Sequence, residues 1–272
     1  MPRLPVSARP LRKLLREIES SGGGDHVLSV GGASELALVL RQQFLRGRAK
    51  PEAVRLGDPN GADVYVHVLA GEPGDEDVAA LRRARHARAS VIAVAVGVAA
   101  DAAIPYVLAT DIVWVGTGEA FPLGAIARAI AARLGEDGAP LAAHVPLLRE
   151  PVCAELVSSI ARKNGVLAAA VWIRGADLPA LTLNQLRLVL RLAQVYGEDG
   201  GLARGPLLTA GLGAAFGWRS LARELARRVP FAPWALNGAV AYAGTRAFGE
   251  WARRSFALSA TQRRAAIARA AP

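Results

Sequence analysis

Short apolar runs alternate with helical segments in the first half of the chain, and this alternation restricts the fold more than any other feature. The apolar runs have the length of buried strands and occupy residues 26–30, 53–58, 63–70, 91–96 and 111–115. The segments with helical periodicity cover residues 35–46, 75–88 and 122–134. Strands that alternate with helices form parallel sheets covered on both faces. We therefore expect an α/β domain over residues 22–136.

The second half lacks this alternation and predicts a helical domain over residues 137–272. We expect two helical segments between Ala142 and Ile173, separated near Asn164-Gly165. A further helix, N-capped by Thr182, is expected to end before Gly197. Its apolar stripe consists of Leu186, Val189, Leu190, Ala193 and Tyr196. Two less polar segments, residues 202–218 and 229–251, follow it and are joined by an arginine-rich stretch.

Residues 1–21 predict an N-terminal amphipathic helix. Its apolar positions recur at helical spacing, with charged residues opposite them, and are Leu11, Leu14, Leu15 and Ile18. Basic residues interrupt the leucines, which is unlike a secretory signal peptide, so we expect the protein to stay inside the cell. The apolar face predicts packing on the next domain, and the alternative is a membrane-surface anchor.

Composition excludes some classes of protein and leaves others open. Hydrophobic residues make up 52% of the 272-residue chain, which excludes an intrinsically disordered protein. Cys153 is the single cysteine, which excludes an internal disulfide scaffold and a cysteine-based zinc cage. The formal net charge is +10, and nearly all the basic residues are arginines. We attribute this excess of arginine mainly to biased composition. The alternative is attraction to an anionic surface, either nucleic acid or phospholipid headgroups.

The segment after the first expected strand stands where a phosphate-binding loop would stand. Residues 31–35 read Gly-Gly-Ala-Ser-Glu, without the lysine of a working loop, and Glu35 would repel a triphosphate. Residues 58–61 match the short pattern D-x-x-G, and residues 98–101 lack the asparagine and lysine that read guanine. We therefore assign no catalytic, cofactor-binding or metal-binding residue and expect no cofactor.

Other polar residues have structural explanations. The four histidines (His26, His67, His86 and His144) are dispersed, and His26 and His67 fall in or beside strands, where a core or rim position is expected. The carboxylates at residues 72–77 are expected in a solvated loop that starts a helix. Cys153 is expected to be buried as a small hydrophobic residue. The cationic positions Arg82, Arg83, Arg85 and Arg88 predict a solvated helix face or, alternatively, a phosphate-binding surface.

A set of short motifs in the second half carries a family resemblance. These are Ala-Asp-Leu-Pro at 176–179, Leu-Thr-Leu-Asn-Gln at 181–185, Tyr196-Gly197, the small-residue stretch 211–217, and Val229-Pro230 leading to residues 239–248. Together they resemble the YcjF-like domain of unknown function, over about residues 150–258. That domain follows Era-type GTPase domains in bacteria, and the element order of residues 22–136 resembles such a Ras-like domain. The resemblance implies a degenerate GTPase-like, P-loop-type sheet followed by a helical module. The alternative for residues 22–136 is another doubly wound domain that never bound a nucleotide.

These observations favour a non-enzymatic, pseudo-GTPase-like protein whose helical domain docks on a membrane or a partner. The expected partners are a membrane surface, a membrane-bound protein or a second copy of the chain, with membrane association on the cytoplasmic side. Residues 229–245 carry no charge but are short for a spanning helix, so peripheral and inserted forms both stay open. One alternative is an active GTP or ATP hydrolase that uses Ser34, Asp58 and Asp101. The other is a basic nucleic-acid-binding module.

Overall fold

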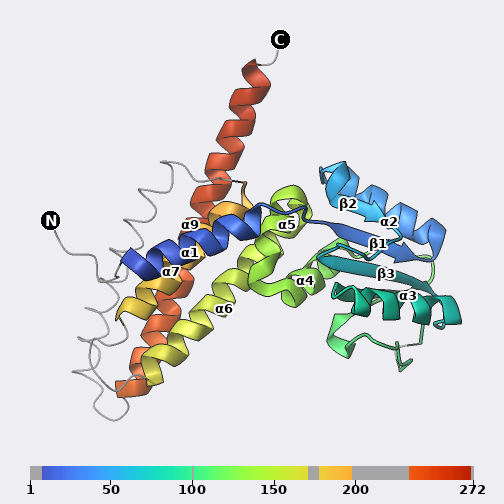
Figure 1. Ribbon diagram of the computed structural model, residues 1–272, viewed down its shortest axis with the longest axis horizontal. Helices are drawn as coiled ribbons and strands as arrows, with labels where there is room; N and C mark the ends of the chain where they lie inside the picture. The colour runs from blue at the N-terminus through green and yellow to red at the C-terminus, as the bar shows by residue number, and fades with distance from the viewer. Residues whose placement is uncertain (1–7, 100, 171–177, 198–232, 271–272) are drawn as a thin grey trace. The chain divides into compact units, whose positions relative to one another are not determined.

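The chain divides into two units, which we call the sheet unit and the helical unit. The sheet unit comprises Gly24–Val152, and the helical unit comprises Met1–Gly23 together with Cys153–Pro272. The computed structural model describes residues 8–99, 101–170, 178–197 and 233–270 (Figure 1). The expected helices within residues 202–228 lie outside the described residues.

A five-stranded parallel sheet forms the centre of the sheet unit, as the alternation of apolar runs predicts. Its strands are β1 (Leu28–Gly32), β2 (Val54–Leu56), β3 (Val64–Ala70), β4 (Ser90–Val96) and β5 (Ile112–Val115). They lie in the order β2-β1-β3-β4-β5, and every neighbouring pair is parallel. This is the strand order of flavodoxin-like doubly wound sheets.

The helices of the sheet unit cover both faces of the sheet. They are α2 (Ser34–Arg46), α3 (Asp75–His86), α4 (Leu123–Leu134) and the short α5 (Ala139–His144). Short 3-10 turns occupy Pro51–Ala53, Ala109–Asp111, Gly135–Gly138 and Pro146–Leu148. Figure 1 shows α2 and α3 on opposite sides of β1 and β3. The residues of β3 alternate between these faces, so Tyr65 and Leu69 pack with Leu81 and Ala84 of α3.

The connection from β2 to β3 contains no helix. It runs through residues 57–63 and ends where the Asp63 backbone N–H donates to the Val27 carbonyl, at 2.9 Å. A parallel crossover usually needs a dozen or more residues. This one is shorter because β2 is only three residues long, which leaves little distance to return along the sheet.

Four long helices make up the described part of the helical unit. They are α1 (Ala8–Gly22), α6 (Arg149–Ala170), which begins in the sheet unit, α7 (Leu178–Val195) and α9 (Pro233–Ala270). None of the helices described is both long and apolar enough to span a bilayer.

Helix α6 is continuous, so the expected break near Asn164-Gly165 is wrong. Asn164 is fully buried; its amide nitrogen donates to the Thr245 hydroxyl at 3.0 Å, and its amide oxygen accepts from Asn184 at 2.8 Å. Gly165 lies where a Cβ atom would come 3.2 Å from the Tyr242 Cβ atom. Asn164 and Gly165 are residues typical of a turn, but here they lie within a helix. Asn164 joins α6 to α7 and α9 by hydrogen bonds, and Gly165 leaves room for α9.

Helix α7 also starts earlier than expected. It begins at Leu178, so Thr182 lies inside the helix and is buried rather than acting as the N-cap. Its apolar surface is wider than one stripe, since Leu188, Leu192 and Val195 are buried along with Leu186, Val189, Leu190 and Ala193. The fifth expected position, Tyr196, follows the last residue of the helix and is half-buried. The reason is that α7 packs against both α1 and α9. Gly197, which follows the helix at φ +68°, ends it as predicted.

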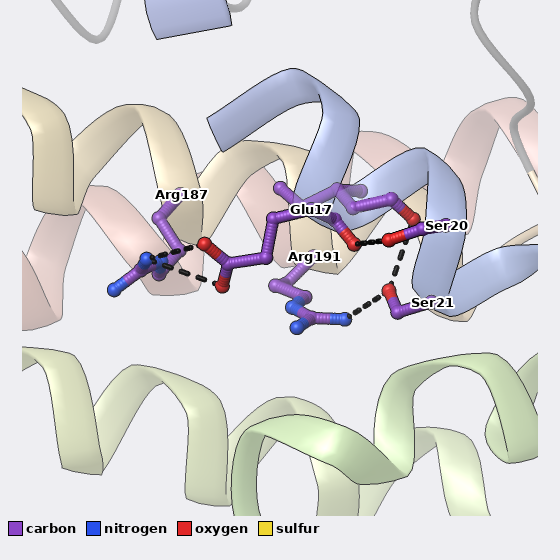
Figure 2. Close-up of polar contacts among 6 residues, drawn as sticks. Glu17, Ser20, Ser21, Arg187 and Arg191 are labelled. Atoms are coloured by element: carbon purple, nitrogen blue, oxygen red, sulfur yellow. Dashed lines mark hydrogen bonds and ion pairs between the residues drawn. The ribbon is translucent and has the colours of Figure 1, made fainter. Parts of the chain in front are cut away.

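The amphipathic face of α1 is covered by α7. Leu14 and Ile18 form a cluster with Leu186 and Leu190, so these apolar positions are used in packing. Polar contacts border the cluster, and Figure 2 shows the ion pair between the Arg187 guanidinium and the Glu17 carboxylate, at 3.2 Å. Arg191, which is 3% exposed, donates to the Ser21 hydroxyl at 2.8 Å.

Close contact between α6 and α9 makes Gly238→Ala a sensitive substitution. A Cβ atom at Gly238 would lie 2.9 Å from the Gly165 carbonyl oxygen and 3.0 Å from the Ala169 Cβ atom. Alanine favours helices by about 1 kcal/mol over glycine, but overpacking costs about 1–3 kcal/mol. We expect a net loss in the free energy of unfolding, measured by chemical denaturation of the full chain. Gly124→Ala in α4 is the matched control, because its Cβ atom would meet nothing closer than 3.6 Å, and it should not destabilise the protein.

Candidate functional site

The carboxyl edge of the sheet between β1 and β3 is where this strand order normally binds ligands. The chain leaves β1 toward one face and β3 toward the other, which in open α/β sheets creates a crevice. Here the connection from β1 to α2 is Ala33 alone. The Ala33 backbone N–H donates to the Val68 carbonyl at 2.8 Å. A Cβ atom at Gly32 would overlap that same carbonyl oxygen, so β1 and β3 stay paired to the very end of the crevice.

The residues that follow offer little to an anion. Ser34 and Glu35 are exposed in the first turn of α2, and residues 28–36 include no lysine or arginine. A carboxylate at a helix N-terminus is itself stabilised by the free N–H groups there, and it competes with any bound phosphate. The first connection therefore has neither the extended loop nor the cation that polyphosphate binding requires.

The other two residues of the hydrolase alternative are not joined to Ser34. The Asp58 carboxylate accepts from the Asn60 backbone N–H at 3.0 Å and so stabilises its own turn. Asp101 is exposed in the connection after β4, beside residue 100, which lies outside the described part of the chain. No hydrogen bond or ion pair links Ser34, Asp58 and Asp101 within the residues described.

A chain of three hydrogen-bonded polar residues lies between β3 and α3, and two of them, Tyr65 and His67, are buried. The Tyr65 hydroxyl is 3.1 Å from His67 Nδ1, and His67 Nε2 is 2.9 Å from the Asp77 carboxylate. The second Asp77 oxygen accepts from the Gly74 backbone N–H at 3.0 Å, at the start of α3. This pattern places the proton on Nε2, so that Nδ1 accepts from the tyrosine hydroxyl.

Burial controls the acid–base properties of this chain. It raises the pKa of Tyr65 to about 12 and lowers the pKa of His67 from its ordinary 6.5, although the hydrogen bond that His67 donates to Asp77 opposes the shift at His67. Both residues are 2% exposed or less. A general acid or base must reach a substrate atom, and these two groups are closed off from solvent. The chain of hydrogen bonds therefore fixes α3 on the sheet.

The tyrosine also fills space near the crevice. A Cβ atom at Gly31 would overlap the Tyr65 hydroxyl, so the phenol ring lies directly against the backbone of β1. Gly31 is paired with His67 across the sheet, on the same face. Protein atoms thus occupy this face of the sheet next to the last residues of β1.

The structure corrects one expectation and confirms others. Asp77 is not simply a solvated helix-start residue, since it holds the buried His67. The two-residue spacing of Tyr65 and His67 on a strand is the sequence signal that places both side chains on one face. Cys153 is fully buried, as predicted. His26 contacts Asp63 at 3.2 Å, and the side chains described contain no cluster that could hold a metal ion.

The cationic positions on α3 and just after it divide into two groups. Arg82, Arg85 and Arg88 line a cavity of about 420 Å³ together with His86 and Tyr106. Arg83 is exposed but does not line the cavity, and its charge acts on Tyr65 and His67.

No family model, no curated protein and no solved structure matches the chain.

The lowered pKa of His67 makes stability depend on pH. The unfolded state takes up a proton more readily than the folded state, so the free energy of unfolding should decrease as pH falls below about 6.5. The slope is at most about 1.4 kcal/mol per pH unit. Denaturation between pH 7.5 and 5 should give a shallower slope for His67→Gln than for the wild-type protein. The exposed His86→Gln serves as control, and equal slopes for all three proteins would contradict the assignment.

Proposed function

We propose that the protein is a non-enzymatic scaffold in which a degenerate GTPase-like sheet unit carries a YcjF-like helical unit that docks on a membrane surface. The observation that carries the first part is the closed connection between β1 and α2. Ala33 gives its backbone N–H to Val68, and Gly32 lies against the same carbonyl oxygen. A phosphate cradle needs several free backbone N–H groups and space for the anion in front of them.

Charge supports the same proposal. A nucleoside triphosphate brings several negative charges, which working loops of this kind neutralise with lysine and a metal ion. Glu35 adds a negative charge at this position instead. The short β1–α2 connection and the negative charge of Glu35 each disfavour a bound nucleotide. Placing a cation at residue 35 alone should therefore not create nucleotide binding.

The docking part of the proposal is supported by an exposed face of α9. Trp251 is 47% exposed and Leu258 is 65% exposed, one behind the other at helical spacing. The Trp251 ring contacts that of the buried Phe248, with centroids 5.9 Å apart, which holds the indole at the surface. An exposed tryptophan and leucine beside cationic side chains are typical of helices that lie in the interface of an anionic bilayer.

The same stretch of α9 keeps a net positive charge. Glu250 pairs with Arg253 at 2.7 Å and with Arg254 at 3.0 Å, so one carboxylate serves two guanidinium groups. Hydrogen bonds from Arg253, and then Arg254, lower the pKa of Glu250 to about 2. Arg246 is exposed one turn before Glu250. The cations therefore outnumber the carboxylate along this stretch of α9, which suits an anionic lipid surface, and of them Arg254 lies nearest to Trp251 around the helix.

Nucleotide titration tests the closed connection. Isothermal calorimetry with GTP and with ATP, each with Mg²⁺, should detect no binding at the β1–α2 connection, and the amide resonances of residues 31–35 should not move. Glu35→Lys removes the repulsion but leaves Gly32 and Ala33 in place, so we expect it to behave as the wild-type protein does. Micromolar binding with shifts at residues 31–35 would overturn the proposal and favour the hydrolase. Binding by Glu35→Lys alone would show that charge and not closure excludes the nucleotide.

Vesicle binding tests the docking face. We expect the protein to cosediment with vesicles that contain phosphatidylserine and not with neutral vesicles. Trp251→Ser with Leu258→Ser should weaken that binding about tenfold or more, because burying a large apolar side chain contributes roughly 1.5–3 kcal/mol. Val166→Ser, at a residue of α6 that is 69% exposed, is the matched control. Docking on lipid through this face would be excluded if the wild-type protein did not bind anionic vesicles. It would also be excluded if the double variant bound them as well as the control does.

A further inference from the structure

We propose that the cavity at the end of α3 binds the phosphate group of a small phosphorylated ligand. Arg82, Arg85, His86, Arg88 and Tyr106 line this cavity, whose volume is about 420 Å³. All five residues are exposed, so this cavity is a hollow open to solvent at the surface of the sheet unit. The inference is independent of the proposed scaffold function, because it concerns a different part of the sheet unit.

The position of the cavity separates it from the closed crevice. Helix α3 begins after the carboxyl end of β3 and returns to the amino end of β4, which starts at Ser90. Arg85 and Arg88 therefore lie at the amino edge of the sheet. The connection from β1 to α2 lies at the carboxyl edge.

The arginines converge without a carboxylate between them. Arg82 and Arg85 are three residues apart on one side of α3, and Arg88 follows at the same interval. No carboxylate lines the cavity, and none forms an ion pair with these three arginines in the parts of the chain that are described. Like charges that line one cavity repel one another, and a bound anion would reduce that repulsion.

The helix macrodipole does not account for all of this charge. Cations in the last turn of a helix are stabilised by its terminal carbonyl groups, and Arg85 and His86 lie in that turn. Arg82 precedes the turn and Arg88 follows the helix, and the effect of the dipole falls off over about one turn. The dipole therefore does not explain why Arg82 and Arg88 line the same cavity as Arg85.

The backbone holds the end of the helix in a defined shape. Arg88 adopts φ +59°, which reverses the chain so that the Ala89 N–H reaches the Ala84 carbonyl at 3.1 Å. Ala84 and Ala89 are both buried in the core. The Cα atoms of Arg85 and Arg88 are thus fixed on either side of a rigid corner.

Tyr106 forms the opposite wall from a strained position. It is a central residue of the turn that the Val107 N–H closes on the Ile104 carbonyl, at 3.4 Å, and its φ is +65°. Glycine or asparagine normally occupies such a position, and a bulky residue there costs roughly 1–2 kcal/mol. Ile104 is 5% exposed and anchors the turn in the core, while Tyr106 stays 43% exposed. A tyrosine retained at this cost has its hydroxyl and ring available to a ligand.

Phosphate is the anion that best fits these donors. Guanidinium groups bind phosphate oxygens through two parallel N–H donors, and a phosphate monoester presents three such oxygens. Three arginines and the Tyr106 hydroxyl supply enough donors for the three phosphate oxygens. A ligand with a single carboxylate has two oxygens and would leave some of these donors without an acceptor. Both a soluble phosphorylated metabolite and the headgroup of a phosphoinositide carry this chemistry.

Calorimetric titration with inorganic pyrophosphate at constant ionic strength tests the site. We expect binding by the wild-type protein and binding about tenfold or more weaker in Arg82→Gln, Arg85→Gln and Arg88→Gln, since each loses a charged contact. Arg83→Gln is the matched control: it removes the same charge from the same helix outside the cavity and should stay within about twofold of the wild type. No binding by the wild type, or equal weakening in the control, would overturn the site.

A second variant separates ligand binding from folding. Tyr106→Gly removes the strain, so the chain should unfold at a higher denaturant concentration, yet its affinity for pyrophosphate should fall severalfold. Unchanged affinity in this variant would remove Tyr106 from the site and leave an unspecific cationic surface, contrary to the proposal.

Vesicles distinguish the two sources of phosphate. Vesicles with a phosphatidylinositol bisphosphate are compared with phosphatidylserine vesicles of equal charge, using the wild type and Arg85→Gln. A preference for the phosphoinositide that Arg85→Gln abolishes supports the proposal with a lipid headgroup as ligand. Pyrophosphate binding without such a preference supports it with a soluble ligand.

Discussion

The close pairing of β1 and β3 is the constraint on which the rest of the sheet unit depends. Gly31 and Gly32 have no side chains, so the Tyr65 ring and the Val68 carbonyl can lie directly against the backbone of β1. The pairing continues through the Ala33 N–H into the first turn of α2. In doubly wound proteins that bind nucleotides, this is where the backbone opens around phosphate. Here its hydrogen-bonding groups serve the sheet.

The polar interior of each unit has the same general role, which is to fix one packing arrangement. In the sheet unit, Asp77 at the start of α3 holds the buried His67 on β3. In the helical unit, Asn164 joins α6 to α7 and α9 through Asn184 and Thr245. Buried polar groups are costly when unpaired, so each such pair disfavours a shifted helix that would separate the partners.

Charge is distributed differently along α3 and α9, and the difference bears on function. On α9 the Glu250 carboxylate lies between two arginines and compensates part of their charge. On α3 the carboxylates gather at the first turn, and the arginines of the other end lack such a partner among the residues described. Cations that the protein does not neutralise are the ones available to an anionic ligand.

Local pattern in the sequence determined the order and type of the five strands and of α2, α3 and α4, and their bounds within two residues, because strand and helix periodicities are read within a few residues. It did not predict the short α5, which follows in the same unit. It also determined the amphipathic face of α1 and the end of α7 at Gly197. Only the tertiary structure decided that Asn164-Gly165 continues a helix, since the Thr245 hydroxyl that satisfies Asn164 is 81 residues away. It likewise decided that Tyr106 faces the arginines of α3 and that Gly32 closes on Val68. The physical reason is that a side chain's role depends on the partner that desolvates or neutralises it, and that partner comes from a distant segment.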